Sequence, residues 1–169
     1  GTIHSLAEEI LADARSTKFN GMMVVDEIPL KMLLLNQAFQ MSGGQYGPRA
    51  KKTSDLRVYC DNTFGGSMDF THRLIQLYHH IIEDQIDLKR LIDEGGQPLV
   101  KSYNEYRNLM SADKRLDFAL LLDLFLCELN EGILDSVVDQ IEYVLVDEYQ
   151  DTNPIQEDIF FVLAKTKNL

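Results

Sequence analysis

The sequence predicts a mainly α-helical fold with a small β component. Apolar residues recur at helical spacing over most of the chain, and glycine and proline gather at a few points between those segments. A single compact run of β-branched and aromatic residues, 141–146, predicts a buried strand of a parallel sheet. The 169 residues are 45% hydrophobic and 25% charged, which is typical of a globular chain and argues against disorder or a membrane span.

The N-terminal third is expected to hold four short elements: a helix over 5–15, a strand or turn over 22–25, a helix over 29–41 and an extended stretch over 56–60. Ser5 is the expected N-cap of the first helix, with Glu8 completing a capping box. Pro29 suits the first turn of the second helix. Gly43 and Gly44 are expected to end that helix.

Three helices are predicted in the middle of the chain. The longest covers residues 67–94 and is expected to stop at Gly95 and Gly96. Residues 98–110 and 114–129 supply the apolar faces that would cover it. Because residues 120–126 are apolar on nearly every side, this part of the third helix is expected to lie deep in the core.

The C-terminal thirty residues read as strand, acidic loop and helix. The apolar run 141–146 ends in Asp147 and Glu148, and the final helix follows with Asn153 as N-cap and Pro154 as first helical residue. Ligands of open α/β sheets gather at the carboxyl ends of strands, and Mg²⁺ prefers carboxylate oxygens. Asp147 could therefore hold a water of a Mg²⁺ shell, while Glu148 could orient or activate an attacking water.

Residues 144–156 closely resemble motif II, the Walker B segment, of UvrD/Rep/PcrA-type superfamily 1 helicases. The matching core reads Asp147-Glu148-Tyr149-Gln150-Asp151-Thr152-Asn153. Residues 1–6 resemble the Thr-x-His segment that precedes the helical insertion in that family. Residues 116–121 resemble its Asp-Phe-Asp-Asp-Leu-Leu helix, except that Ala119 and Leu120 replace two of the acids.

The resemblance implies part of a RecA-like (P-loop NTPase) α/β motor domain that carries a helical insertion. Residues 1–18 would be a motor segment with the Thr-x-His motif, 19–110 the insertion, and 111–169 the motor segment with Walker B. The parent protein is then expected to be an ATP-dependent DNA helicase or translocase, acting in repair or recombination. Its expected partners are single-stranded and duplex DNA and the remaining motor domains, with a cytoplasmic, nucleoid-associated location and no membrane.

The same resemblance assigns site residues. ATP and Mg²⁺ are the implied cofactors, with Glu148 as the catalytic residue and Asp147 supporting the metal through water. Gln150 and Asp151 would link the nucleotide site to neighbouring motor elements. Thr2 and His4 would face DNA.

The phosphate-binding loop of such enzymes is not in this sequence, which lacks even one Gly-Lys dipeptide. The chain is therefore expected to be an internal slice of the parent, and the isolated polypeptide is expected neither to bind ATP tightly nor to hydrolyse it.

The chain is acidic, with 16 Lys and Arg against 27 Asp and Glu, a formal net charge of −11. Residues 1–110 carry a net −2 and residues 111–169 a net −9, a balance that disfavours non-specific duplex binding. The most basic stretch, 43–52 with Arg57, predicts a solvated loop, with phosphate contact and stacking by Tyr46 as the alternative.

Two other functions are compatible with the residues: a non-catalytic acidic helical interaction module, and a metal-dependent nuclease using Asp147, Glu148 and Asp151. Several further side chains have both a structural and a functional interpretation, and the structural one is favoured.

Surface or half-buried helix positions are favoured over a metal site for the group His72, His79, His80, Asp69 and Asp84. Cys60 and Cys127 are expected to be buried thiols in a reducing compartment. Met22 and Met23 are expected to pack in the core and not to form a ligand-binding surface.

Overall fold

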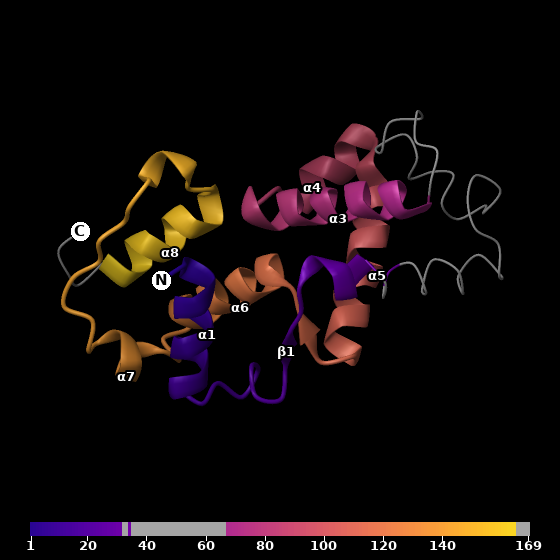
Figure 1. Ribbon diagram of the computed structural model, residues 1–169. Helices are drawn as coiled ribbons and strands as arrows, with labels where there is room; N and C mark the ends of the chain where they lie inside the picture. The colour runs from indigo at the N-terminus through magenta and orange to yellow at the C-terminus, as the bar shows by residue number, and fades with distance from the viewer. Residues whose placement is uncertain (32–33, 35–66, 165–169) are drawn as a thin grey trace. The chain divides into compact units, whose positions relative to one another are not determined.

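The computed structural model of the protein describes residues 1–31, 34 and 67–164 (Figure 1). The expectations for the 43–52 loop, the extended stretch at 56–60 and Cys60 lie outside the described residues. The chain divides into two compact units. The first contains Gly1–Val24, Ile82–Gln85 and Lys114–Leu169, and the second contains Val25–Ile81 and Ile86–Asp113.

Helices dominate the described residues, so the prediction of a mainly helical chain is confirmed. In chain order the elements are α1 (Ile3–Asp13), β1 (Met23–Val24), α3 (Ser67–Glu83), α4 (Leu88–Leu91), the π-helix η2 (Ile92–Gly96), α5 (Gln97–Ala112), β2 (Arg115–Leu116), α6 (Phe118–Asn130), α7 (Asp135–Val138), the 3₁₀-helix η3 (Tyr149–Asp151) and α8 (Pro154–Ala164). Residues 27–31 are also helical.

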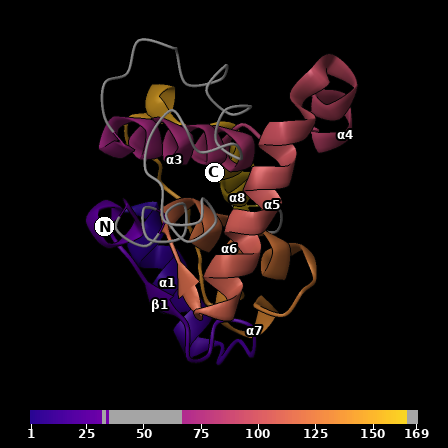
Figure 2. The same cartoon turned by 90° about the vertical axis from the view of Figure 1, so that its right-hand side faces the viewer.

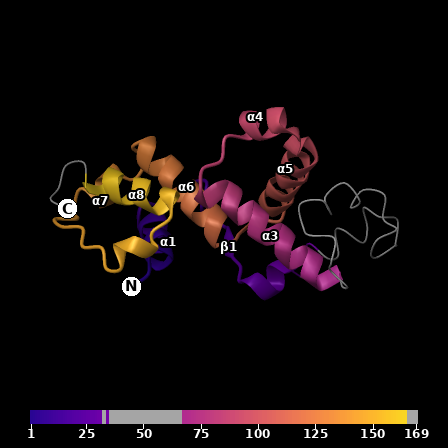
Figure 3. The ribbon, with the colours of Figure 1, turned by 90° about the horizontal axis from the view of Figure 1, so that it is seen from above.

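Helix α6 is the centre of the first unit, where it packs against both α1 and α8 (Figure 3). Its side chains Leu121, Leu122 and Phe125 are fully buried, as the apolar run 120–126 predicted. Leu11 of α1 and Ile159 of α8 are fully buried as well. This shared core fixes the position of α8, and with it the C-terminal end of the segment that follows residue 146.

The N-terminus of α1 differs from the prediction by one turn. Thr2, not Ser5, is the N-cap, because its Oγ1 accepts a hydrogen bond of 3.3 Å from the Ser5 backbone N–H. Both residue types cap well, and the earlier one adds a further helical turn. Of the apolar stripe predicted from Leu6, Ile10 and Leu11, the last two are buried, whereas Leu6 is 37% exposed and Ala7 takes its place in the core.

Strands β1 and β2 form a two-stranded parallel sheet in which Met23 pairs with Arg115 and Val24 with Leu116. Of the two alternatives for residues 22–25, a strand or a turn, the structure has the strand, at Met23–Val24. Met23 is 63% exposed, however, so its expected core role is wrong. The helix expected over 114–129 begins only at Phe118, because the buried Asp117 caps it by accepting a 2.9 Å hydrogen bond from Leu120 N–H.

The single helix predicted over 67–94 is wrong. Helix α3 ends at Glu83, and Gln85 adopts a left-handed conformation with φ of 50°. Asp87 then caps the short helix α4. The apolar spacing continues across this break, so periodicity alone did not reveal that polar residues stop the helix.

A π-helical turn joins α4 to α5 in the second unit, where Figure 2 shows α4 at one end of α5. Gly96 is buried, and a Cβ there would lie 2.7 Å from atoms of Leu91. The core of this unit includes three buried tyrosines, of which Tyr78 and Tyr106 stack with ring centroids 4.8 Å apart. Tyr103 lies beside both.

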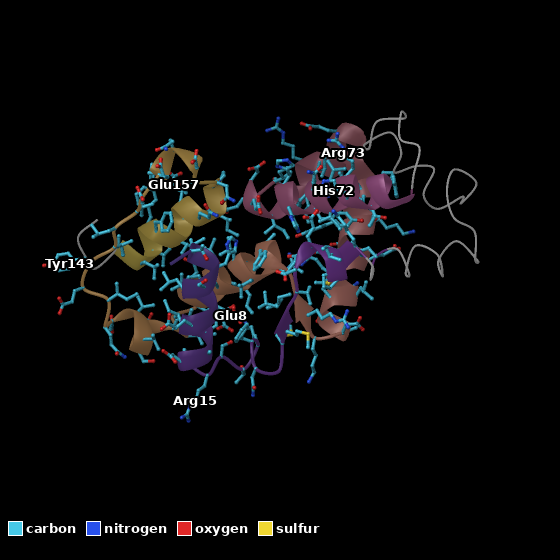
Figure 4. All side chains as sticks on the ribbon, in the orientation of Figure 1. Glu8, Arg15, His72, Arg73, Tyr143 and Glu157 are labelled. Carbon is cyan, nitrogen blue, oxygen red and sulfur yellow. The ribbon has the colours of Figure 1, made fainter. Side chains whose placement is uncertain are left out.

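The buried strand predicted over 141–146 is also wrong. These residues run as extended chain with one isolated bridge at Tyr143, whose side chain is 66% exposed, and Leu145 is 92% exposed. Figure 4 shows Tyr143 pointing away from the ribbon. A run of apolar residues becomes a buried strand only where strands pair with it and helices cover its faces. The only ladder within the described residues joins β1 and β2.

Candidate functional site

The segment between residue 146 and α8, residues 147–153, is called the acidic loop below. Its C-terminal end is fixed by α8, where Asn153 Oδ1 accepts a 3.1 Å hydrogen bond from Gln156 N–H. Pro154 is the first residue of the helix. The predicted N-cap and first-turn proline are thus confirmed, and they place three carboxylates, of Asp147, Glu148 and Asp151, directly before the helix.

The backbone of the acidic loop turns sharply at Glu148, which is left-handed with φ of 53° and ψ of 42°. This conformation costs an L-residue about 1–2 kcal/mol. Two local hydrogen bonds hold the turn, from Asp151 N–H to Glu148 O at 2.9 Å and from Thr152 N–H to Tyr149 O at 3.1 Å. Such strain in a non-glycine residue is common at functional sites.

Side chains within the loop brace one another. Gln150 donates its amide N–H to Glu148 Oε2, and the Glu148 backbone N–H donates to Asp147 Oδ1 at 3.0 Å. Tyr149 donates its phenol to Glu157 of α8, and this hydrogen bond raises the pKa of Tyr149. Glu148 and Gln150 are therefore held together.

The exposed acids of the loop have the donor chemistry of a magnesium site. Asp147 and Glu148 each keep one carboxylate oxygen without a hydrogen bond inside the loop. Within the described residues, no three histidine, cysteine or acidic side chains converge as a metal-binding group. Mg²⁺ commonly takes one or two carboxylates and completes its shell with water and substrate phosphates, so the free oxygens of Asp147 and Glu148 are the ones that could contribute to such a shell.

The other predicted site residues lie at the start of α1. His4 packs its ring against Phe118 of α6, with ring centroids 5.0 Å apart and planes tilted by 56°. Burial lowers the pKa of His4 below its ordinary value of 6.5, so the imidazole is uncharged at neutral pH. Phe118 stays 42% exposed and was not predicted as a site residue. The only sequence feature that could have pointed to Phe118 is its position directly after Asp117 in the segment 116–121, which resembles a motif of the helicase family.

Thr2 is the N-cap of α1, the helix that contains His4. Its Oγ1 caps α1 and lies 3.0 Å from Ser5 Oγ. Among the described residues, no hydrogen bond or ion pair joins Thr2 or His4 to the acidic loop. The structure therefore brings the predicted residues together as two separate groups, the acidic loop and the α1 start with Phe118.

Two further sequence expectations concern side chains outside these groups. His72 of α3 (Figure 4) places Nδ1 2.8 Å from Glu27 Oε1, an oxygen that also lies 2.6 Å from Lys31 Nζ. Cys127 is exposed, so the buried thiol predicted there is wrong. Its thiol donates to Glu131 at 3.3 Å, and this hydrogen bond raises the pKa of Cys127.

A family comparison matches the whole chain. The sequence model of the UvrD/REP helicase N-terminal domain covers residues 1–169. No curated protein and no solved structure matches. None of the helices in the described ranges 1–31 and 67–164 is long and apolar enough to cross a membrane.

Proposed function

The chain belongs to the UvrD/REP helicase family, and we propose that its parent polypeptide is an ATP-dependent helicase or translocase that acts on single-stranded and duplex DNA in repair or recombination. The acidic loop carries this proposal, because its strained Glu148 and braced carboxylates lie immediately before a capped helix. Residues 1–18 and 111–169 would belong to a RecA-like motor domain, and residues 19–110 to its helical insertion.

The acidic loop is proposed to bind the nucleotide with its metal. Bound Mg²⁺-ATP supplies an electrophilic γ-phosphate and positive charge that offsets the negative charge of the reaction. Asp147 would hold a water of the metal shell through the oxygen not bonded to Glu148 N–H. Glu148 would accept a proton from the attacking water, and Gln150 would hold its carboxylate in place through the amide hydrogen bond.

Asp151 lies at the end of η3, where its backbone N–H already closes the turn onto Glu148. Its exposed carboxylate is free to face a neighbouring motor element, which is the linking role proposed for Asp151 and Gln150.

The start of α1 is proposed to face single-stranded DNA. The uncharged imidazole of His4 and the exposed part of the Phe118 ring form a tilted aromatic pair. Aromatic faces stack on bases with little dependence on sequence. Thr2 would add a hydroxyl at the exposed end of the same turn.

The decisive experiment is the variant Glu148→Gln in the parent polypeptide. The amide keeps the size of the side chain but cannot take a proton, so ATP hydrolysis should fall about 10²–10⁴-fold while ATP still binds. Glu142→Gln, an exposed acid of the preceding segment, is the matched control and should leave turnover unchanged. Full turnover by Glu148→Gln would contradict the proposed role.

The 169-residue chain itself should show no ATP turnover in the same assay. Its sequence contains no Gly-x-x-x-x-Gly-Lys loop, whose backbone and lysine would hold the β- and γ-phosphates. Turnover by the chain alone at the rate of an intact helicase would refute this expectation.

A further inference from the structure

One turn of α8 binds two other segments of the first unit. Glu157 accepts the phenol of Tyr149 from the acidic loop, and the next residue, Asp158, accepts a 2.7 Å hydrogen bond from Gln85 Nε2. Gln85 lies in the turn that ends α3, within the stretch Ile82–Gln85 of this unit. Adjacent residues of one helix therefore hold both the acidic loop and the turn after α3. Glu157 is labelled on α8 in Figure 4.

Gln85 is an unusual residue for its backbone position. It closes α3 with hydrogen bonds from Gln85 N–H to Ile82 O at 3.1 Å and from Ile86 N–H to Ile81 O at 3.0 Å. This left-handed closing position favours glycine or asparagine. Glycine would close the helix at lower cost but could not reach α8, whereas the glutamine side chain spans the distance to Asp158.

Helix α8 is packed against α6 on both sides of the two acidic residues. Ile155 and Ile159, one on each side of the acidic pair, are buried in the contact with α6. Because Glu157 and Asp158 are consecutive residues of one packed helix, a displacement of one carries the other with it. The path Tyr149–Glu157–Asp158–Gln85 thus joins Tyr149 and Gln85 without a direct contact between them.

We propose that Gln85 and Asp158 form a coupling contact that transmits the state of the acidic loop to the turn that ends α3. Both are positioning residues, and neither is proposed to touch the nucleotide. This inference rests on the proposed function, because it takes ATP bound at the acidic loop as the ligand whose binding changes the turn that ends α3. The contact itself is testable without nucleotide.

The test is amide hydrogen exchange in the 169-residue chain with Gln85→Gly, Tyr149→Phe and the double variant. Gln85→Gly keeps the left-handed backbone and removes only the side chain, so misfolding through strain is avoided. Gln85→Gly should speed exchange at Thr152 N–H, and Tyr149→Phe should speed exchange at Ile86 N–H, because coupling is reciprocal. In the double variant the two effects should depart from additivity by about twofold or more.

Arg15→Gly is the matched control, since Arg15 is exposed, left-handed with φ of 52°, and ends α1. It should leave exchange at Thr152 unchanged. Additive effects of Gln85→Gly and Tyr149→Phe would overturn the proposal, and so would an equal change caused by Arg15→Gly.

A second measurement separates this proposal from the proposed function. In the parent polypeptide, Mg²⁺-ATP should change exchange at Ile86 N–H, and Gln85→Gly should abolish that change. If ATP binds but the response at Ile86 survives in Gln85→Gly, the coupling is overturned while the nucleotide role stands. If non-additivity is found in the chain but the parent binds no nucleotide, the coupling is supported and the proposed function fails.

Discussion

Replacing Glu148 by glycine should make the chain more stable while removing a residue proposed to be essential. Relief of the left-handed backbone at φ of 53° is worth about 1–2 kcal/mol. The greater freedom of glycine in the unfolded chain offsets about 0.4–1 kcal/mol of this gain. The exposed hydrogen bond with Gln150 offsets a few tenths more, so at the midpoints of these ranges Glu148→Gly should raise the free energy of unfolding by about 0.5 kcal/mol.

Urea denaturation of the 169-residue chain measures this change. Lys114→Gly, at an exposed residue with φ of 52°, should stabilise similarly, because the same backbone strain is relieved. Glu142→Gly is the opposite control, since Glu142 does not have a positive φ and only the entropic cost of glycine remains. If Glu148→Gly destabilises the chain as much as Glu142→Gly does, the reasoning from strain is refuted.

Two further predictions concern residues near the starts of α6 and α1. Asp117→Ala should lower the free energy of unfolding by about 1–2 kcal/mol through loss of the cap to Leu120 N–H, whereas Asp117→Asn should lose less; equal losses in urea titrations would show that the cap is not the cause. The pKa of His4 is lowered in the folded state, so the unfolded chain takes up this proton more readily and stability should fall as the pH drops below about 6.5. The variant His4→Gln should show a smaller fall between pH 7.5 and 5.5, and an identical pH dependence would contradict the proposed burial effect.

Predictions from the sequence were confirmed where the hydrogen bonds of an element come from residues close to it in the chain. The cap formed by Asn153 and the proline after it were both predicted, because each depends on residues close in the chain. The deep burial of Leu121, Leu122 and Phe125 followed from a run that is apolar on all sides. The family, too, was evident from the acidic loop residues in their order.

The sequence-based predictions failed where the local structure depends on residues far away in the chain or on a backbone turn that has no sequence signal. The break after α3 is closed by Gln85, a residue type that sequence patterns do not single out as a stop. Asp87 suits the N-cap of a new helix, but the apolar spacing that continues across the break masked this signal. The contact between His4 and Phe118 joins residues more than a hundred positions apart, so spacing could not reveal it. Thr2 and Ser5 are equally good caps by type, and only the three-dimensional path of the chain distinguishes them.

The acidic loop keeps its shape although no paired strand directly precedes it among the described residues. The loop is held by hydrogen bonds within residues 147–152, by its tie to Glu157 and by the packing of α8 on α6. None of these contacts involves Tyr143 or Leu145, whose apolar surface is largely open to solvent. Covering either side chain would add about 1.5–3 kcal/mol of hydrophobic stabilisation. That gain would leave the strained turn at Glu148 in place, so the geometry proposed for catalysis is encoded in the loop and in α8.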